Sequence, residues 1–292
     1  MQEDNADAQC RVSVGLVVRN AERTLSLAVR SIVAQTYPHW ELLVADDGSR
    51  DGTTEILHGF RDQRIHVVAH TESSGLAARL NELTDLSRGK YFARMDADDF
   101  AFADRLAKQV RFLEEHAEVD LLGCSAINFE AQGKIVGKSR VATTHEEICR
   151  RPWRGFPLFH PTWMGRRDWF RENKYDARLR RAQDFELLLR TFPHSRFHCL
   201  EEPLLGYRVE QLTLARQFRS RKNVVRILLR HAVRHGDVRL FWGAAAQGLK
   251  FGLDSVAILT GLRFKLLRQR ALPVSESERE AFQRTWAALQ TN

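Results

Sequence analysis

The sequence predicts an α/β protein with a mostly parallel sheet flanked by helices, followed by a basic helical extension. Short apolar runs of strand length alternate with segments of helical periodicity, and the runs are apolar on both faces, which is typical of strands in parallel sheets. An excess of Lys and Arg after residue 215 predicts the extension. With 43% hydrophobic and 28% charged residues, the composition excludes a disordered chain and a polytopic membrane protein.

The first half of the chain supplies the repeating units of the sheet. Its predicted strands are apolar runs at residues 12–18, 40–45, 65–69, 90–95 and 119–127. The predicted helices between them are a segment that starts at Asn20 and ends before Pro38, then residues 53–60, 76–86 and 104–116. Strands joined by crossover helices lie parallel, and ligands bind beyond their carboxyl ends. The acidic clusters 46–47 and 96–99 fall at such ends.

The pattern is looser after residue 134. Residues 150–167 are rich in Trp, Pro, Gly and His, which favours a binding loop over a regular element. Residues 183–191 predict a short helix, and residues 204–209 predict an edge strand. After residue 217 the chain reads as helical and basic throughout.

The positive charge is confined to one region. The chain carries a formal charge of +8, which invites a nucleic-acid partner. Residues 216–270, however, hold thirteen Lys and Arg against two acids, and the rest of the chain is slightly acidic. Because the excess charge avoids the predicted ligand edge, we expect no nucleic acid as a partner.

The ends and the cysteines indicate the compartment. Residues 1–10 are acidic and polar, which predicts a flexible tail and does not suit a signal peptide. The four cysteines are widely spaced with no C-x-x-C pair, which favours reduced thiols. We therefore expect a cytoplasmic protein.

Asp96 and Asp98, together with Asp99, put three carboxylates at a strand end and form a candidate metal site. Asp96 and Asp98 alternate along an extended segment, so their side chains point to the same side and can converge on one ligand. Carboxylate oxygens suit Mg²⁺ or Mn²⁺, which take few protein ligands beside substrate phosphates. The alternative is a solvated acidic turn that caps the helix starting near Asp104.

The D-x-D pattern has companions in a fixed order along residues 11–209. They are VSVGLVVRN (12–20), SIVAQTYPHWELLVADDGSRDGT (31–53), SSGLAARLN (73–81), RGKYFARMDADDFAFADRLAKQVRFLE (88–114), HPTWMGRRDWF (160–170) and AQDFELLLR (182–190). With these stretches the chain resembles the family 2 glycosyltransferases of the GT-A fold. The resemblance implies a sugar transferred from a nucleotide-sugar, a UDP-sugar, to a hydroxyl of a glycan or lipid-linked acceptor in bacterial cell-surface polysaccharide synthesis.

The resemblance also implies roles in binding the donor. Val17, where the family usually has Pro, would lie against the base, and Asp47 with Asp46 would contact uracil and ribose. Asp96 would hold the ribose and the metal region. Asp98 would ligate the divalent metal, Mn²⁺ or Mg²⁺, that bridges the diphosphate.

Asp184 occupies the position of the family's catalytic base. A carboxylate there can take the proton of the attacking hydroxyl, and one base with in-line displacement implies inversion at the anomeric carbon. The alternative role is an N-cap of the following helix. Gln183 and Glu210 replace the usual Glu and His of neighbouring motifs. These departures leave a second reading open, a non-catalytic nucleotide-sugar or polysaccharide-binding module with the same fold.

Two aromatic residues of the 150–167 loop are candidates for acceptor contact. His160 and Trp163 present rings that suit sugar faces, although ordinary packing of the loop explains them equally well.

The expected organisation is a GT-A catalytic domain followed by a basic region. Residues 11–215 form the catalytic domain, with the nucleotide-sugar half at 11–127 and the acceptor half at 128–215, and residues 216–292 form the basic helical region. Within it, residues 217–270 fit an amphipathic surface on an anionic membrane, at the cytoplasmic face of the inner membrane. The alternative is a helical subdomain packed on the catalytic domain.

Overall fold

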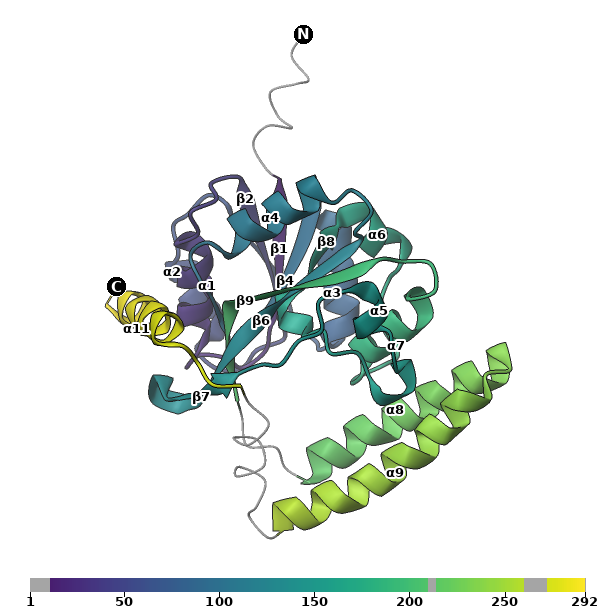
Figure 1. Cartoon of the computed structure of the whole chain (residues 1–292). Coiled ribbons are helices and arrows are strands. Elements are labelled where there is room, and N and C mark those ends of the chain that lie inside the picture. Colours follow the sequence, from purple (N-terminus) through teal and green to yellow (C-terminus); the bar gives the residue numbers. More distant parts are fainter. Residues whose placement is uncertain (1–10, 210–213, 260–271, 292) are drawn as a thin grey trace.

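Strands and helices alternate through the first half of the chain in the computed structural model (Figure 1). The structure describes residues 11–209, 214–259 and 272–291. The predicted tail at 1–10, Glu210 and part of the basic stretch lie outside the described residues.

The strands of the described chain join one mixed sheet. Its strands are β1 (Val12–Val18), β2 (Trp40–Asp47), β3 (Ile65–His70), β4 (Tyr91–Asp96), β5 (Phe100–Ala101), β6 (Leu121–Phe129), β7 (Ile135–Lys138), β8 (Met164–Arg166) and β9 (Phe197–Arg208). The order is β3-β2-β1-β4-β8-β6-β9-β5, with β7 beside β6. Strands β3, β2, β1 and β4 are mutually parallel, and so are β6 and β9, whereas β8, β5 and β7 pair antiparallel. The predicted fold class is confirmed.

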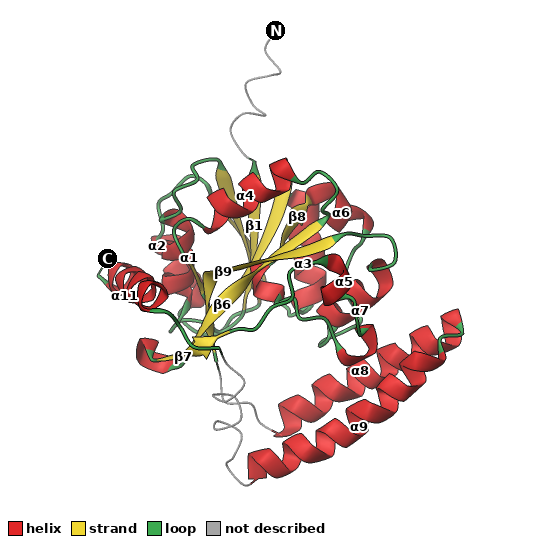
Figure 2. Cartoon of the chain, viewed as in Figure 1, coloured by secondary structure: helices red, strands yellow, loops and turns green. Residues whose placement is uncertain are grey.

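Helices lie on both sides of this sheet (Figure 2). The α-helices up to residue 191 are α1 (Leu25–Val33), α2 (Thr53–Gly59), α3 (Leu76–Leu86), α4 (Arg105–Glu115), α5 (His145–Ile148), α6 (Arg167–Glu172) and α7 (Gln183–Thr191). Three more follow: α8 (Leu214–His235), α9 (Val238–Leu259) and α11 (Glu276–Gln290). The helices predicted at 76–86 and 183–191 have the observed bounds.

The central strands are buried on both faces, as the apolar runs predict. One apolar cluster includes Leu16 and Val44, and another on the opposite side includes Leu43 and Phe92. Because residues of one strand alternate between faces, β2 contributes to both clusters. Because β1, β2 and β4 pair in parallel, their carboxyl ends lie at one edge of this buried sheet.

The edge strand predicted at 204–209 is wrong in length and position. Strand β9 begins at Phe197 and lies between β6 and β5. The exposed Glu201 and Glu202 interrupt its apolar pattern, and register shifts against β6 accompany the interruption. The sequence therefore shows only the second half of a strand that is internal to the sheet.

The C-terminal helices pack at two separate places. Helices α8 and α9 lie side by side and share a cluster with α7, formed by Leu189, Leu228 and Ala244 among others (Figure 1). Helix α11 instead packs Phe282 against Phe100 of β5. Helices α8 and α9 therefore pack as the alternative of a helical subdomain predicts, whereas α11 packs against the sheet. None of the described helices has the length and apolar character needed to cross a membrane.

Candidate active site

The loops after β1 and β2 are tied together at the ligand edge of the sheet. Asn20 has a positive φ of 53°. Its side-chain oxygen accepts a hydrogen bond from the Arg50 backbone at 2.8 Å, and its own N–H donates to Ser49 Oγ at 3.0 Å. Asp51 Oδ2 also accepts the backbone N–H of Glu22 at 3.2 Å. These bonds join two segments that are about thirty residues apart in the sequence into one surface at this edge of the sheet.

Asp46 and Asp47 end β2 with both carboxylates buried. Asp46 accepts hydrogen bonds from the Ser49 backbone and from Thr54 Oγ1, both at 2.9 Å. It therefore holds the start of the next helix, and its nucleotide contact stays a prediction.

Asp47 is held by the loop that precedes α3. It accepts Ser73 Oγ at 2.6 Å, the backbone N–H groups of Ser74 at 2.8 Å and Gly75 at 2.9 Å, and Arg79 Nε at 2.8 Å. Burial raises the pKa of Asp47, but the hydrogen bonds outweigh it and leave the pKa below its usual range. Gly75 has a φ of +91°, a conformation that suits glycine and lets its N–H reach the carboxylate.

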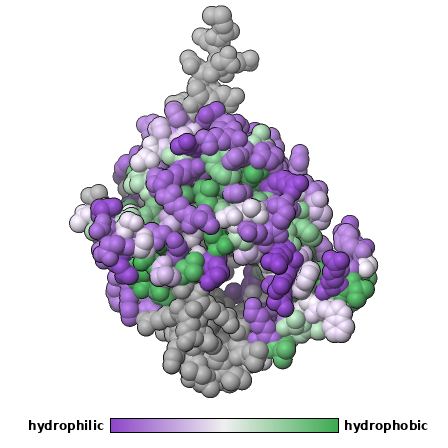
Figure 3. Space-filling model, in the orientation of Figure 1, coloured by the Kyte–Doolittle hydropathy of each residue, from purple (hydrophilic) through white to green (hydrophobic). Residues whose placement is uncertain are grey.

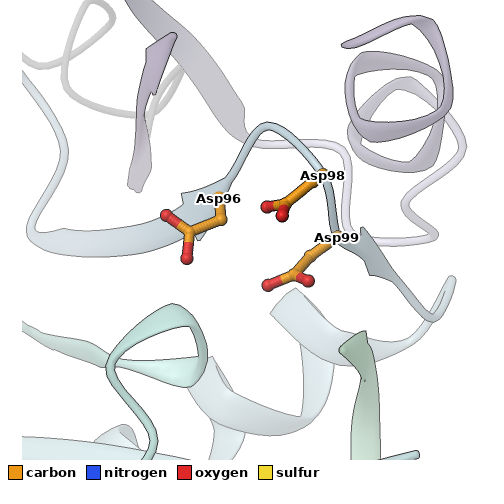
Figure 4. A group of neighbouring side chains, drawn as sticks. All are labelled: Asp96, Asp98 and Asp99. Carbon is orange, nitrogen blue, oxygen red and sulfur yellow. The ribbon is translucent and has the colours of Figure 1, made fainter. Parts of the chain in front are cut away.

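Three carboxylates gather where β4 ends. One carboxylate oxygen from each of Asp96, Asp98 and Asp99 lies within 4.8 Å of the other two. In Figure 4 the carboxylates of Asp98 and Asp99 point toward the side on which Asp96 lies. Asp99 Oδ1 accepts the Arg208 backbone N–H at 2.9 Å, whereas Oδ2 is buried with no partner among the described residues. Burial, then the charges of Asp96 and Asp98, raise the pKa of Asp99 well above its usual value.

This donor set fits a divalent cation. Hard oxygens at this spacing are the ligands that Mg²⁺ and Mn²⁺ prefer. Asp99 Oδ2 is a buried acceptor without a donor, and a cation would satisfy it and offset the mutual repulsion of the three carboxylates. The solvated acidic turn is a poorer description, because Asp99 is only 1% exposed and Asp104 makes no side-chain cap on α4.

Arg94 orients the first of these carboxylates. It lies two residues before Asp96 on β4, is 2% exposed, and forms an ion pair with Asp96 through Nη2. Its Nε and Nη1 are buried and have no hydrogen-bond partner within the described chain. Unpartnered buried donors are costly, so these atoms are suited to binding an anionic or polar group.

Asp184 lies in the first turn of α7, partly exposed to a cavity of about 520 Å³. The cavity is also lined by Arg94, Asp96, His160 and Tyr207. Burial raises the pKa of Asp184, while the backbone N–H of Phe185 and the charge of Arg94 act in the opposite direction. No side-chain cap hydrogen bond is made at the start of α7. The Asp184 carboxylate therefore lines the cavity while it also interacts with backbone N–H groups of the first helical turn.

Asp96 separates this cavity from a second one. The second cavity, of about 430 Å³, is lined by Val17, Arg19, Asn20 and Asp98, and Asp96 lines both. Val17, Asp96 and Asp98 thus converge as the sequence predicts, while Asp184 faces the neighbouring cavity. Two reactants bound in the two cavities would meet at Asp96.

The two aromatic candidates differ in position. His160 lines the Asp184 cavity and its Nε2 is 2.8 Å from the Tyr175 hydroxyl. Burial and the charge of Arg94 hold the pKa of His160 well below its usual range, so the ring is neutral near pH 7. Trp163 is fully buried and donates its indole N–H to the Leu158 carbonyl at 3.3 Å. Acceptor contact through Trp163 is therefore wrong, because the loop folds its ring into the core.

Comparison with known proteins identifies the family. The family model described as Glycosyl transferase family 2 matches residues 13–173, more than half of the chain. The chain belongs to glycosyl transferase family 2. It is therefore a glycosyltransferase.

Relatives of this family 2 glycosyltransferase come from several organisms. EpsE of Bacillus subtilis (strain 168), provisionally named a glycosyltransferase, is 34% identical over 207 residues, which is 69% of this chain and 70% of EpsE. WfgD of Escherichia coli, named a UDP-Glc:alpha-D-GlcNAc-diphosphoundecaprenol beta-1,3-glucosyltransferase, is 35% identical over 129 residues, 44% of this chain and 49% of WfgD.

Solved structures share the GT-A fold. TarS of S. aureus (residues 1–349, with UDP-GlcNAc) gives a TM-score of 0.60 at 18% identity, covering 75% of this chain and 66% of that one. This chain spans 40% of the longer TarS chain. The mannosyltransferase PcManGT of Pyrobaculum calidifontis, with GDP-Man and Mn²⁺, gives 0.59 at 18% identity, covering 96% and 87%.

Sequence reasoning placed Asp99 in the acidic cluster without a role of its own, and it missed the roles of Arg94 and Arg208 in the glycosyltransferase site. A charged residue inside a buried strand is the signal that could have singled out Arg94. Arg208 binds the acidic turn from β9, through its backbone to Asp99 and through Nε to the Asp98 carbonyl at 2.9 Å. No local pattern reveals this contact, because the partners are about 110 residues apart.

Proposed function

We propose that the chain is an inverting, metal-dependent glycosyltransferase that moves a sugar from a UDP-sugar to a hydroxyl of a glycan or lipid-linked acceptor in bacterial cell-surface polysaccharide synthesis. The observation that carries the proposal is the position of Asp96 between the Val17 cavity and the Asp184 cavity. The names of WfgD, for donor and acceptor, and of PcManGT, for Mn²⁺, support the same reading.

In this proposal the donor lies in the Val17 cavity and its diphosphate faces the acidic cluster. Asp96, Asp98 and Asp99 would hold the divalent metal, whose chemical contribution is to offset charge on the leaving diphosphate. Arg94 fixes the Asp96 carboxylate through their ion pair. Three protein oxygens from one turn of chain leave room for phosphate oxygens beside them.

The acceptor hydroxyl reaches the anomeric carbon from the Asp184 cavity. As its oxygen bonds to that carbon, Asp184 takes the proton, and the bond to the diphosphate breaks with the electron pair leaving on the nucleoside diphosphate. The raised pKa brings the Asp184 carboxylate closer to the operating pH and makes it a better base. A single displacement with one base inverts the configuration of the sugar.

The test replaces the base and keeps its shape. Asp184→Asn is expected to lower transfer by about 10²- to 10⁴-fold while UDP-sugar binding with Mn²⁺, followed by thermal shift, stays unchanged. The matched control is Asp168→Asn, since Asp168 is also the second residue of its helix but its side chain is 76% exposed. Unchanged transfer in Asp184→Asn, or no UDP-sugar bound by the wild-type chain, would reject the proposal.

Membrane contact through α8 and α9 completes the proposal. Their outer surface exposes Val233, Trp242 and Leu249 by more than 70% each, next to Arg and Lys side chains. Figure 3 shows strongly hydrophilic residues beside neutral and hydrophobic ones at the exposed end of this helix pair. Such a surface suits the headgroup region of an anionic cytoplasmic leaflet. Co-sedimentation with anionic vesicles should fall in Trp242→Ser/Leu249→Ser, and equal sedimentation of variant and wild type would reject the contact.

A further inference from the structure

A basic groove runs between α8 and the loop that leads to Asp184. It has a volume of about 650 Å³ and is lined mainly by cationic side chains, against the single carboxylate of Asp176. The cationic residues are Arg178, Arg180, Arg181, Arg219, Lys222, Arg226 and Arg230. A concave site of this size matches small-molecule sites, whereas a flat membrane surface offers nothing that would fill it.

The groove and the Asp184 cavity share part of their lining. Arg180 and Arg181 line both the groove and the Asp184 cavity, and Ser220 of α8 also reaches the latter. Asn223 of α8 donates a hydrogen bond to the Arg181 carbonyl at 3.1 Å, which fixes the helix against the loop. A ligand in the groove would therefore be continuous with one in the Asp184 cavity, and separate from the donor cavity at Val17.

The cations of α8 that line the groove form a stripe on one side of the helix. Arg219, Lys222, Arg226 and Arg230 follow one another at spacings of three and four residues, which places them on one helix face. Like charges at these spacings destabilise a helix. Asp176 offsets little, because it already bonds Arg178 at 2.8 Å and lies 3.8 Å from Arg230. Within the described chain, Lys222 and Arg226 make no ion pair at all.

We infer that this groove binds the diphosphate of the acceptor, with the acceptor sugar extending past Arg180 and Arg181 to Asp184. Guanidinium groups bind phosphate oxygens in pairs, so a row of them suits a diphosphate better than a carboxylate or a neutral glycan. The donor diphosphate belongs at the acidic cluster, since that is where a divalent cation fits. The inference rests on the proposed function and names the class of acceptor, a sugar linked through a diphosphate.

The exposed apolar residues of α8 and α9 agree with a lipid on the far side of that diphosphate. Phe218 is 51% exposed and precedes the stripe, and Phe241 and Trp242 are exposed on α9. An acceptor whose diphosphate joins a sugar to a hydrophobic chain would place each part against a matching surface: sugar at Asp184, phosphates at the stripe, and chain at the apolar surface.

The test reverses two charges of the stripe and compares them with two charges nearby. The variant is Lys222→Glu/Arg226→Glu. The matched control is Arg234→Glu/Arg239→Glu, because Arg234 of α8 and Arg239 of α9 are exposed but do not line the groove. Binding of inorganic pyrophosphate is measured by calorimetry in EDTA, so that no metal draws it to the acidic cluster. We expect the variant to lose about tenfold or more in affinity while the control keeps it.

Further measurements distinguish a lipid diphosphate from free pyrophosphate, and they separate a failure of this inference from a failure of the proposed function. A short-chain lipid diphosphate carrying N-acetylglucosamine should show the same loss as pyrophosphate, and a neutral octyl glycoside of that sugar should show none. UDP binding with Mn²⁺ should be equal in all three proteins, which also checks folding. Equal pyrophosphate affinity in variant and wild type, or equal loss in both charge-reversal proteins, overturns the inference that the groove binds a diphosphate. Absence of UDP binding in the wild-type chain counts against the proposed function alone, because the EDTA arm needs no donor.

Discussion

Replacing Asp47 by Asn tests whether this carboxylate serves the loop or the nucleotide. Asp47 Oδ1 accepts hydrogen bonds from the Ser74 backbone and Arg79, and Oδ2 accepts them from Ser73 and the Gly75 backbone. An amide keeps one oxygen but turns an NH₂ group toward the donors on the other side. The change therefore removes the buried negative charge opposite Arg79. It also leaves the amide NH₂ facing groups that are themselves hydrogen-bond donors.

The expected loss of stability follows from these contacts. A buried donor without an acceptor costs about 1–3 kcal/mol, and breaking a buried ion pair costs about 3–5 kcal/mol. Because the Arg79 and Asp47 side chains are 11% and 5% exposed, we expect Asp47→Asn to lower the free energy of unfolding by about 3–5 kcal/mol at pH 7. Asp85→Asn removes a comparable but exposed pair with Lys174 and should cost about 1 kcal/mol or less.

Urea unfolding at several pH values provides the assay. The pKa of folded Asp47 is lowered, so its contribution is fully present above the ordinary aspartate pKa of about 3.9 and is lost as the pH falls through the folded value. The gap between wild type and Asp47→Asn should therefore close in acid. A loss below about 1 kcal/mol, together with weakened UDP binding, would refute the reasoning and assign Asp47 to the nucleotide.

Three more outcomes are expected. In a pH profile of kcat/KM, activity should fall as Asp184 is protonated, with a midpoint above the ordinary aspartate pKa of about 3.9. The pKa of Asp184 is raised because burial and the charge of Asp96 outweigh the effects of Arg94 and the Phe185 N–H. A midpoint at or below about 3.9 would contradict this. Chelation by EDTA should abolish transfer and excess Mn²⁺ should restore it, whereas transfer that persists in EDTA would reject the metal site. Phe282→Ala should cost about 3–5 kcal/mol in urea unfolding, while an effect below about 1 kcal/mol would mean that α11 does not pack on Phe100.

Elements with local signals were predictable from the sequence. The helices at 76–86 and 183–191 and the buried strands follow from periodicity that each segment carries within itself. Asp96 and Asp98 were expected to converge by alternation along an extended segment, but β4 ends at Asp96 and a turn at residues 97–98 brings Asp98 and Asp99 beside it. Parallel topology then places Val17 at the same edge without any knowledge of side-chain contacts.

Contacts between distant segments were not predictable in the same way. Trp163 is an aromatic residue in an irregular loop, and no local pattern tells whether its ring faces solvent or core. The buried partners of Asp47 come from residues 73–79, and Arg208 bonds Asp99 across a sequence separation of 109 residues. Such groups are chosen by tertiary packing, which acts on pairs that the sequence separates.

Helix α11 changes how the chain can be divided. Its Phe282 and Trp286 surround Phe100 with Phe129, and Lys138 both pairs with Leu272 and bonds Glu278 at 2.7 Å. A truncation after residue 215 would therefore strip two aromatic rings from the sheet as well as removing the basic helices. Helices α8 and α9 are an insertion between two parts of one folding unit. Exchanging α8 and α9 between family members, with α11 kept, would combine the proposed acceptor surface of one protein with the catalytic core of another.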